Sequence, residues 1–205
     1  MNLVATTDTA YRFDTGQEFV RVTSALSLVR ADLRTIPLEV LHHASERGKA
    51  VHRAAWILAG GDPSGLHWPS VHEEVRPYVE GFQAFQRETG CQFIEQERLV
   101  VSQRFWYAGR LDLLGRWKDA HGIIDLKTGE PHATHRLQAS AYLEAFVEET
   151  KTRKRLRRWI LYLLPSGRYR VVDCDEVCGH HGDFFVFTQI LGVYRWLQGN
   201  GGKDT

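Results

Sequence analysis

Two strand-like segments joined by a short polar turn place the strongest constraint on the fold of this chain. Residues 105–114 and 123–127 are mostly apolar, and residues 118–122 between them read Lys-Asp-Ala-His-Gly, which is typical of a turn. Two apolar runs on either side of a short turn predict a β-hairpin. We expect the rest of the chain to be organised around this hairpin.

Charged side chains lie on both predicted strands. If the turn is centred between Asp119 and Ala120, Asp112 of the first strand faces Lys127 of the second, and Asp125 lies one strand period from that lysine. Side chains two residues apart on a strand point to the same face. The hairpin therefore gathers two carboxylates and a lysine into one patch.

Such a patch suits metal-assisted chemistry on phosphate. Two carboxylates a few ångströms apart repel each other unless a cation lies between them. Oxygen-rich sites of this kind bind Mg²⁺ or Mn²⁺, which make water nucleophilic near neutral pH. A neighbouring lysine would stabilise charge on the phosphate, so the implied reaction is phosphodiester hydrolysis. The alternative is a pair of solvated charges on a strand, since short charge patterns are common.

Helices are predicted from apolar periodicity and end signals. Pro37 suits a first helical turn, and Gly48 divides the helical stretch after it into two pieces. Residues 70–73 form a capping box for the next helix, which Gly90 ends. The predicted ranges are 23–29 with Thr23-Ser24 as caps, 38–59, 71–89, 134–149 with Thr134 as cap, and 184–197.

Further strands are predicted from alternating patterns. Residues 93–101 form one strand, on which Glu97 shares a face with apolar side chains. A carboxylate there is either paired with a cation or directed into a metal pocket. The other strands form hairpins, one at residues 11–22 around Asp14-Thr-Gly16, and one at 159–164 and 169–174 around Pro165-Ser-Gly167.

Three more polar side chains lie on predicted helices. His52 is in a stretch whose apolar side chains form a buried face, and it is either a packed or surface histidine or a metal ligand. Gln138 and Tyr142 are i,i+4 neighbours that lean to one side of their helix. Alternatively, Tyr142 is a core aromatic and Gln138 lies at the rim.

Composition indicates one ordinary globular domain. A chain of 205 residues with 43% hydrophobic and 25% charged residues has enough material for a sizeable core. The expected division is an N-terminal helical part at about 23–90, a catalytic core at about 91–175 and a C-terminal helix at about 182–198. Without a long apolar run or the features of a signal peptide, we expect no membrane contact and a cytoplasmic location.

The net charge of +1 gives no strong overall attraction to nucleic acid, so binding must depend on local clusters. One such cluster, at residues 151–158, includes Arg153 and Arg155 and is either a solvated segment or a phosphate-contacting ridge. Three cysteines do not suggest a disulfide framework. A zinc module remains an alternative, built from Cys174, Cys178, His180 and His181, although the spacing matches no familiar finger. There is no nucleotide-binding Gly-x-x-x-x-Gly-Lys loop.

Taken in order, these motifs resemble the PD-(D/E)XK nuclease superfamily, in its RecB-like and phage exonuclease branch. The resemblance covers the chain from about residue 22 to residue 142. Glu97 falls in a strand where such proteins often carry an acid. The motifs are Val22-Thr-Ser24, Arg47-Gly-Lys-Ala-Val-His52, which is similar to the Gly-x-x-x-His helix, Gly109-Arg-Leu-Asp112, Asp125-Leu-Lys127 and Gln138-Ala-Ser-Ala-Tyr142.

The resemblance implies an α/β fold with a restriction-endonuclease-like core, in which helices flank a central mixed β-sheet. It also implies residue roles. The implied metal ligands are His52, Asp112, Asp125 and the backbone carbonyl of Leu126, with Glu97 as an accessory acid. Lys127 is the implied catalytic lysine, and Gln138 and Tyr142 orient the site or contact the DNA backbone.

The resemblance further implies a Mg²⁺- or Mn²⁺-dependent nuclease acting on DNA, most often an exonuclease of the phage and recombination-repair type. Three cysteines are too few for the four-cysteine iron–sulfur cluster of some members, so no cluster is expected. A separate annealing, recombination or helicase protein is a possible partner. An endonuclease and a non-cleaving DNA-binding or assembly subunit remain alternatives.

Overall fold

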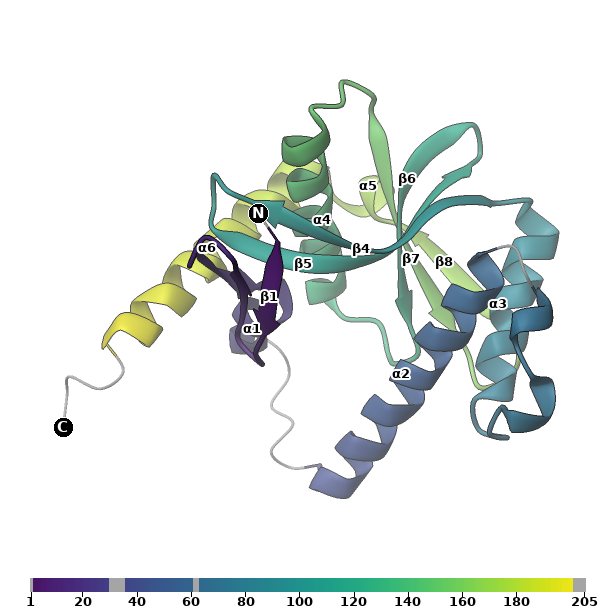
Figure 1. Cartoon of the computed structure of the whole chain (residues 1–205). Helices are drawn as coiled ribbons and strands as arrows, with labels where there is room; N and C mark the ends of the chain where they lie inside the picture. The colour runs from purple at the N-terminus through teal and green to yellow at the C-terminus, as the bar shows by residue number, and fades with distance from the viewer. Residues whose placement is uncertain (1, 30–35, 61–62, 201–205) are drawn as a thin grey trace.

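A twisted, eight-stranded mixed sheet forms the centre of the molecule (Figure 1). This is a computed structural model, and it describes residues 2–29, 36–60 and 63–200. The strand order is β1-β2-β3-β5-β6-β7-β8, and β4 also pairs with β5. The strands are β1 (Leu3–Thr6), β2 (Ala10–Phe13), β3 (Glu18–Arg21), β4 (Gln92–Ser102), β5 (Tyr107–Trp117), β6 (Ala120–Lys127), β7 (Leu156–Leu163) and β8 (Tyr169–Asp173).

Helices cover both faces of this sheet, as predicted for an α/β protein with a central mixed sheet. The longer helices are α2 (Leu38–Ala59), α3 (Arg76–Thr89), α4 (Ala133–Thr150) and α6 (His180–Asn200), and the short ones are α1 (Val22–Leu26) and α5 (Cys174–Val177). One apolar core joins α1, α4 and α6 to β4, β5 and β6. A second core joins α2 and α3 to the other face. No described helix has the length and hydropathy needed to cross a bilayer.

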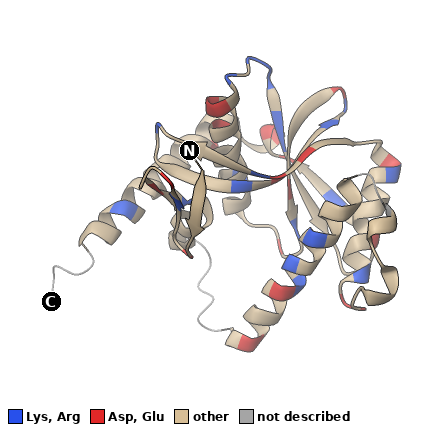
Figure 2. Ribbon diagram, viewed as in Figure 1, with Lys and Arg blue, Asp and Glu red and all other residues tan. Residues whose placement is uncertain are grey.

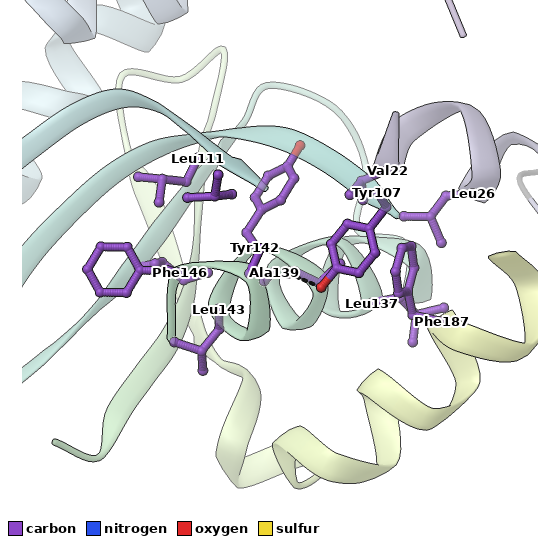
Figure 3. Packing of buried hydrophobic residues seen from close by; sticks show 14 of the residues in the cluster. Val22, Leu26, Tyr107, Leu111, Leu137, Ala139, Tyr142, Leu143, Phe146 and Phe187 are labelled. Carbon is purple, nitrogen blue, oxygen red and sulfur yellow. Dashed lines mark hydrogen bonds between the residues drawn. The ribbon is translucent and has the colours of Figure 1, made fainter. Parts of the chain in front are cut away.

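The core beneath α4 shows how the helix is fixed to the sheet (Figure 3). Ala139, Leu143 and Phe146 are buried, in agreement with the predicted apolar stripe. Tyr107 of β5 reaches across this core, and its hydroxyl donates a hydrogen bond of 2.8 Å to the Ala141 carbonyl. The helix is therefore held at a fixed distance from β5, the strand that carries the first predicted acid.

The central hairpin forms, but the predicted register is wrong. Leu113 pairs with Ile124, and the turn contains only Lys118 and Asp119, both with positive φ. Turns with two left-handed residues match the twist of a β-hairpin, so the strands close over two residues. Extending this register by one position places Asp112 opposite Asp125, whereas the predicted register placed it opposite Lys127.

One edge of β5 is shared by two different strands. Parallel pairing with β3 ends at Ala108, and antiparallel pairing with β6 begins at Leu113. Residues 109–112 of β5 therefore lie in an interval between the two neighbours on this edge, whereas β4 pairs along the other edge. The Gly-x-x-Asp motif spans this interval, which leaves space beside the backbone for a functional site.

Several predicted helix boundaries are also wrong. α2 is continuous through Gly48, so it does not divide into two pieces. α3 begins at Arg76, after the expected capping box, because Pro77 suits its first turn. Arg21 precedes α1 without a side-chain cap, and His132 caps α4 in place of Thr134. β1 and α5 were not predicted.

Candidate metal centre

Asp112 lies at the centre of the candidate site, in the interval between β3 and β6. Its Oδ2 accepts a hydrogen bond of 2.7 Å from the Leu126 N–H of β6. Its Oδ1 lies 3.3 Å from Nδ1 of His52, which α2 presents to the strand. The carboxylate thus joins β5, β6 and α2 where the β5–β6 pairing has ended.

Three potential metal ligands converge here. Donor atoms of His52, Glu97 and Asp112 all lie within 4.8 Å of one another, and this is the one such group in the part of the chain that the structure describes. Glu97 adopts a left-handed backbone with φ of 49°, which costs a non-glycine residue energy and is common at functional sites. One nitrogen and two carboxylate donors suit Mn²⁺ or Mg²⁺, so the residues present fit the predicted metal.

Asp125 belongs to a second group directly beside the first. Its Oδ2 forms an ion pair with the Lys127 ammonium, and its Oδ1 accepts a hydrogen bond of 3.2 Å from Gln138. The same Gln138 amide nitrogen donates to the Tyr142 hydroxyl at 3.0 Å. Gln138 is therefore a buried positioning residue and not a rim residue. The predicted ligand Asp125 is outside the group of three and is held by its own partners.

The pKa values of the site residues are shifted in different directions. Burial alone would lower the pKa of His52, but the Asp112 carboxylate outweighs burial and the pKa is raised. Burial alone would raise the pKa of Asp112, but His52 and Lys127 lower it. The pKa of Asp125 is raised to about 6, mainly by burial; Asp112 raises it further, and Lys127 partly offsets the shift. Burial also raises the pKa of Glu97. The two carboxyl groups of raised pKa, those of Asp125 and Glu97, favour a bound cation.

Gly109 is explained by the position of Tyr142. The Tyr142 ring points from α4 toward the strands (Figure 3) and lies against the Gly109 backbone. A Cβ on residue 109 would be 3.0 Å from Cδ1 of this ring and would overlap Cε1. The first residue of the Gly-x-x-Asp motif therefore allows the tyrosine to reach the site.

Replacing Gly109 by alanine is expected to reduce the free energy of unfolding by about 1–3 kcal/mol, as overpacking of a filled core does. It should also lower any activity of the site, because the displaced ring carries the hydroxyl that contacts Gln138. Urea unfolding followed by circular dichroism measures the first effect. Gly192→Ala is the matched control, since a Cβ on that exposed helical residue meets nothing within 4 Å. Equal stability of both variants would contradict this account.

Open space surrounds the site on two sides. Two pockets of about 480 and 900 Å³ share His52 as a lining residue, and a smaller one of about 140 Å³ lies at the interval in β5. Leu126 and Lys127 line the first pocket, and Glu97 and Asp112 line the second. The candidate site is therefore open to a ligand from both sides of His52.

Sequence patterns did not identify Arg110 as a site residue, although it lies inside the Gly-x-x-Asp motif. Its Nη1 donates to the Glu97 carbonyl at 3.1 Å, and its Nε lies 3.9 Å from a Glu97 carboxylate oxygen. The side chain therefore holds both ends of Glu97 beside Asp112. Its two-residue spacing from Asp112 was the available signal, because both side chains point to the same strand face.

The predicted basic ridge lies elsewhere. Arg153 and Arg155 are exposed in the segment before β7, which begins beside His121 of β6. Lys127 pairs with Tyr162 at the far end of the same two strands, about 20 Å away at the usual strand rise. These two arginines are therefore not part of the candidate site.

The late cysteines and histidines do not form a zinc site in the described residues. Nδ1 of His180 lies 2.9 Å from the Ser140 hydroxyl, and Nε2 lies 3.1 Å from Glu144. Burial raises the pKa of the Cys174 thiol to about 12, which disfavours the thiolate that zinc binds. His180 instead joins α6 to α4.

Comparison with known proteins adds no relative. No family model matches the sequence, and no curated protein matches it. A functional assignment therefore depends on the residues of the site and on their geometry.

Proposed function

We propose that this protein is a metal-dependent deoxyribonuclease with a PD-(D/E)XK-type core, which hydrolyses phosphodiester bonds and acts as an exonuclease. The observation that carries the proposal is the convergence of His52, Glu97 and Asp112 directly beside the Asp125–Lys127 ion pair. A non-cleaving subunit would need neither the donor group nor the lysine. The exonuclease mode follows from the resemblance to phage exonucleases.

The first group would hold the metal. His52, Glu97 and Asp112 supply the ligands, and the motif resemblance adds Asp125 and the Leu126 carbonyl. When bound, Mg²⁺ or Mn²⁺ supplies positive charge to the scissile phosphate and lowers the pKa of water. The hydrogen bond from the Leu126 N–H fixes one oxygen of Asp112, which leaves the other oxygen directed at His52.

The second group would act on the phosphate. The Lys127 ammonium lines the pocket, and in the resting site it pairs with Asp125. Donation from this ammonium to a phosphate oxygen stabilises the charge that develops during in-line attack. The Gln138 amide keeps Asp125 in place by donating a hydrogen bond of 3.2 Å, and the same nitrogen donates to the Tyr142 hydroxyl at 3.0 Å. Lys127 therefore has a fixed starting position.

The direct test uses a linear duplex, a linear single strand and a covalently closed circle, each incubated with Mn²⁺ or with EDTA. We expect nucleotides to be released from linear DNA only with the metal, and the circle to stay intact. Cutting of the circle would make the enzyme an endonuclease. Binding of DNA without any cleavage of the three substrates would instead support the non-cleaving subunit.

A further inference from the structure

A basic groove with an exposed indole leads to the candidate metal centre. The pocket of about 900 Å³ lies between α2 and the strands β4 and β5. His52, Glu97 and Asp112 are part of its lining, together with basic side chains from three elements. Figure 2 shows the basic positions on α2 and β5. The basic residues are Arg21, Lys49, Arg53 and Arg110.

Arg53 is the most available of these cations. Lys49 pairs with Glu46, and Arg110 contacts Glu97. Arg21 donates to the Thr7 carbonyl at 2.9 Å and lies over the Tyr11 ring. Arg53 forms no ion pair with any acid in the described part of the chain. A basic side chain that faces a groove without an acidic partner is able to neutralise a phosphate and release its counterions.

Trp56 lies in the same groove. It follows His52 by four residues, so it is on the same side of α2 and about 6 Å further along the helix axis. Its side chain is 49% exposed, and among the described residues it stacks on no other aromatic ring. The apolar face of α2 that packs into the core is formed by other residues, which are Val51, Ala54, Ala55 and Leu58. Trp56 therefore lies outside the buried apolar face of α2.

We propose that this groove binds a single DNA strand, with a base stacked on Trp56 and a phosphate on Arg53. The inference rests on the proposed nuclease function and adds the strandedness of its substrate. Basic grooves with aromatic platforms bind single strands because every base offers a flat face for stacking. In a duplex, the faces of the bases are already stacked on their neighbours, so the indole cannot reach them. The short distance to His52 places the stacked base close to the scissile phosphate.

The test is binding of a fluorescein-labelled oligothymidine and of a labelled duplex, measured by anisotropy in EDTA. Wild type should bind the single strand more tightly than the duplex. Trp56→Ala should weaken single-strand binding about 5- to 100-fold, and Trp56→Phe should retain most of the affinity. Trp196→Ala is the matched control, since that tryptophan is 65% exposed on α6, outside the groove.

Arg53→Gln tests the phosphate contact separately. Loss of one phosphate contact should reduce the slope of log affinity against log salt by about 0.7 for a single strand. The slope of Trp56→Ala should stay as in wild type, because stacking releases no counterions. Circular dichroism checks that each variant is folded.

The outcomes separate this inference from the nuclease proposal. Unchanged single-strand affinity in Trp56→Ala, or tighter binding of the duplex by wild type, would overturn the groove assignment even if DNA is cut. Loss of affinity in Trp56→Ala but not Trp196→Ala would support it, even if Mn²⁺ gives no cleavage. Absence of cleavage in that case would overturn only the proposal that the protein is a nuclease.

Discussion

Asp125→Asn is expected to abolish DNA cleavage and, at the same time, to make the metal-free protein more stable. Asp125 is 2% exposed, and its pKa rises from 3.8 to about 6 on folding. Because one pKa unit corresponds to about 1.4 kcal/mol, the buried charge costs at most about 3 kcal/mol above pH 7. Asparagine removes that charge and can still accept the Gln138 hydrogen bond.

The pH dependence follows from the same shift. A pKa that is raised on folding contributes stability below the unfolded value of 3.8 and loses it as the pH rises through about 6. The advantage of the variant over wild type should therefore shrink by about 1 kcal/mol between pH 8 and pH 5. Urea unfolding of both proteins in EDTA at the two pH values measures this difference. Asp8→Asn, on an exposed residue, should change nothing.

The loss of cleavage has a different cause. Without the carboxylate, Lys127 loses its ion-pair partner and the predicted ligand set loses an oxygen, so we expect cleavage in Mn²⁺ to fall at least about 10²- to 10³-fold. DNA binding in EDTA should remain close to wild type. Normal cleavage by Asp125→Asn would refute the catalytic role of Asp125. Lower stability of this variant than of wild type at both pH values would refute the claim that the buried charge destabilises the protein.

The hairpin shows what sequence patterns can and cannot predict. Two apolar runs and a polar turn between them were enough to locate β5 and β6. The register was wrong because it depends on which residues adopt positive φ, and Lys118 has no intrinsic preference for that conformation. Its ammonium lies over the Trp117 ring, 4.5 Å from the centroid. This is a local contact that turn propensities do not include.

The residues of the candidate site were predicted better than its geometry. The spacing of Gln138 and Tyr142 correctly placed them on one side of a helix, where Gln138 donates to both the Tyr142 hydroxyl and the Asp125 carboxylate. The closeness of Glu97 to Asp112 was not predictable, because it depends on a left-handed residue within β4 and on the interval in β5. That interval exists because β3, from the distant N-terminus, pairs with the start of β5.

Charge clusters were the least predictable feature, and Arg158 shows the reason. It belongs to the basic run at 151–158, yet its side chain is fully buried. Nη2 donates to Asp175 at 2.8 Å, and Nη1 donates to Asp183 at 2.8 Å. Its partners are 17 and 25 residues later in the chain, on α5 and α6. The spacing of basic residues alone does not reveal such partners.

Arg158→Met is therefore expected to reduce the free energy of unfolding by about 3–5 kcal/mol, because it removes the buried cation that pairs with Asp183 and Asp175 at 2.8 Å. The arginines that remain, Arg136 and Arg157, lie further from these carboxylates, at 3.5 and 3.9 Å. Urea unfolding measures the loss, and Arg153→Met is the control, with an expected change within about 0.5 kcal/mol for an exposed residue. Adding Asp183→Asn to Arg158→Met should cost less than the sum of the two single changes, since Asp183 has already lost its shorter ion pair, the one of 2.8 Å to Arg158. If Arg158→Met instead weakened DNA binding without loss of stability, the arginine would be a phosphate contact and not the buried link between β7, α5 and α6.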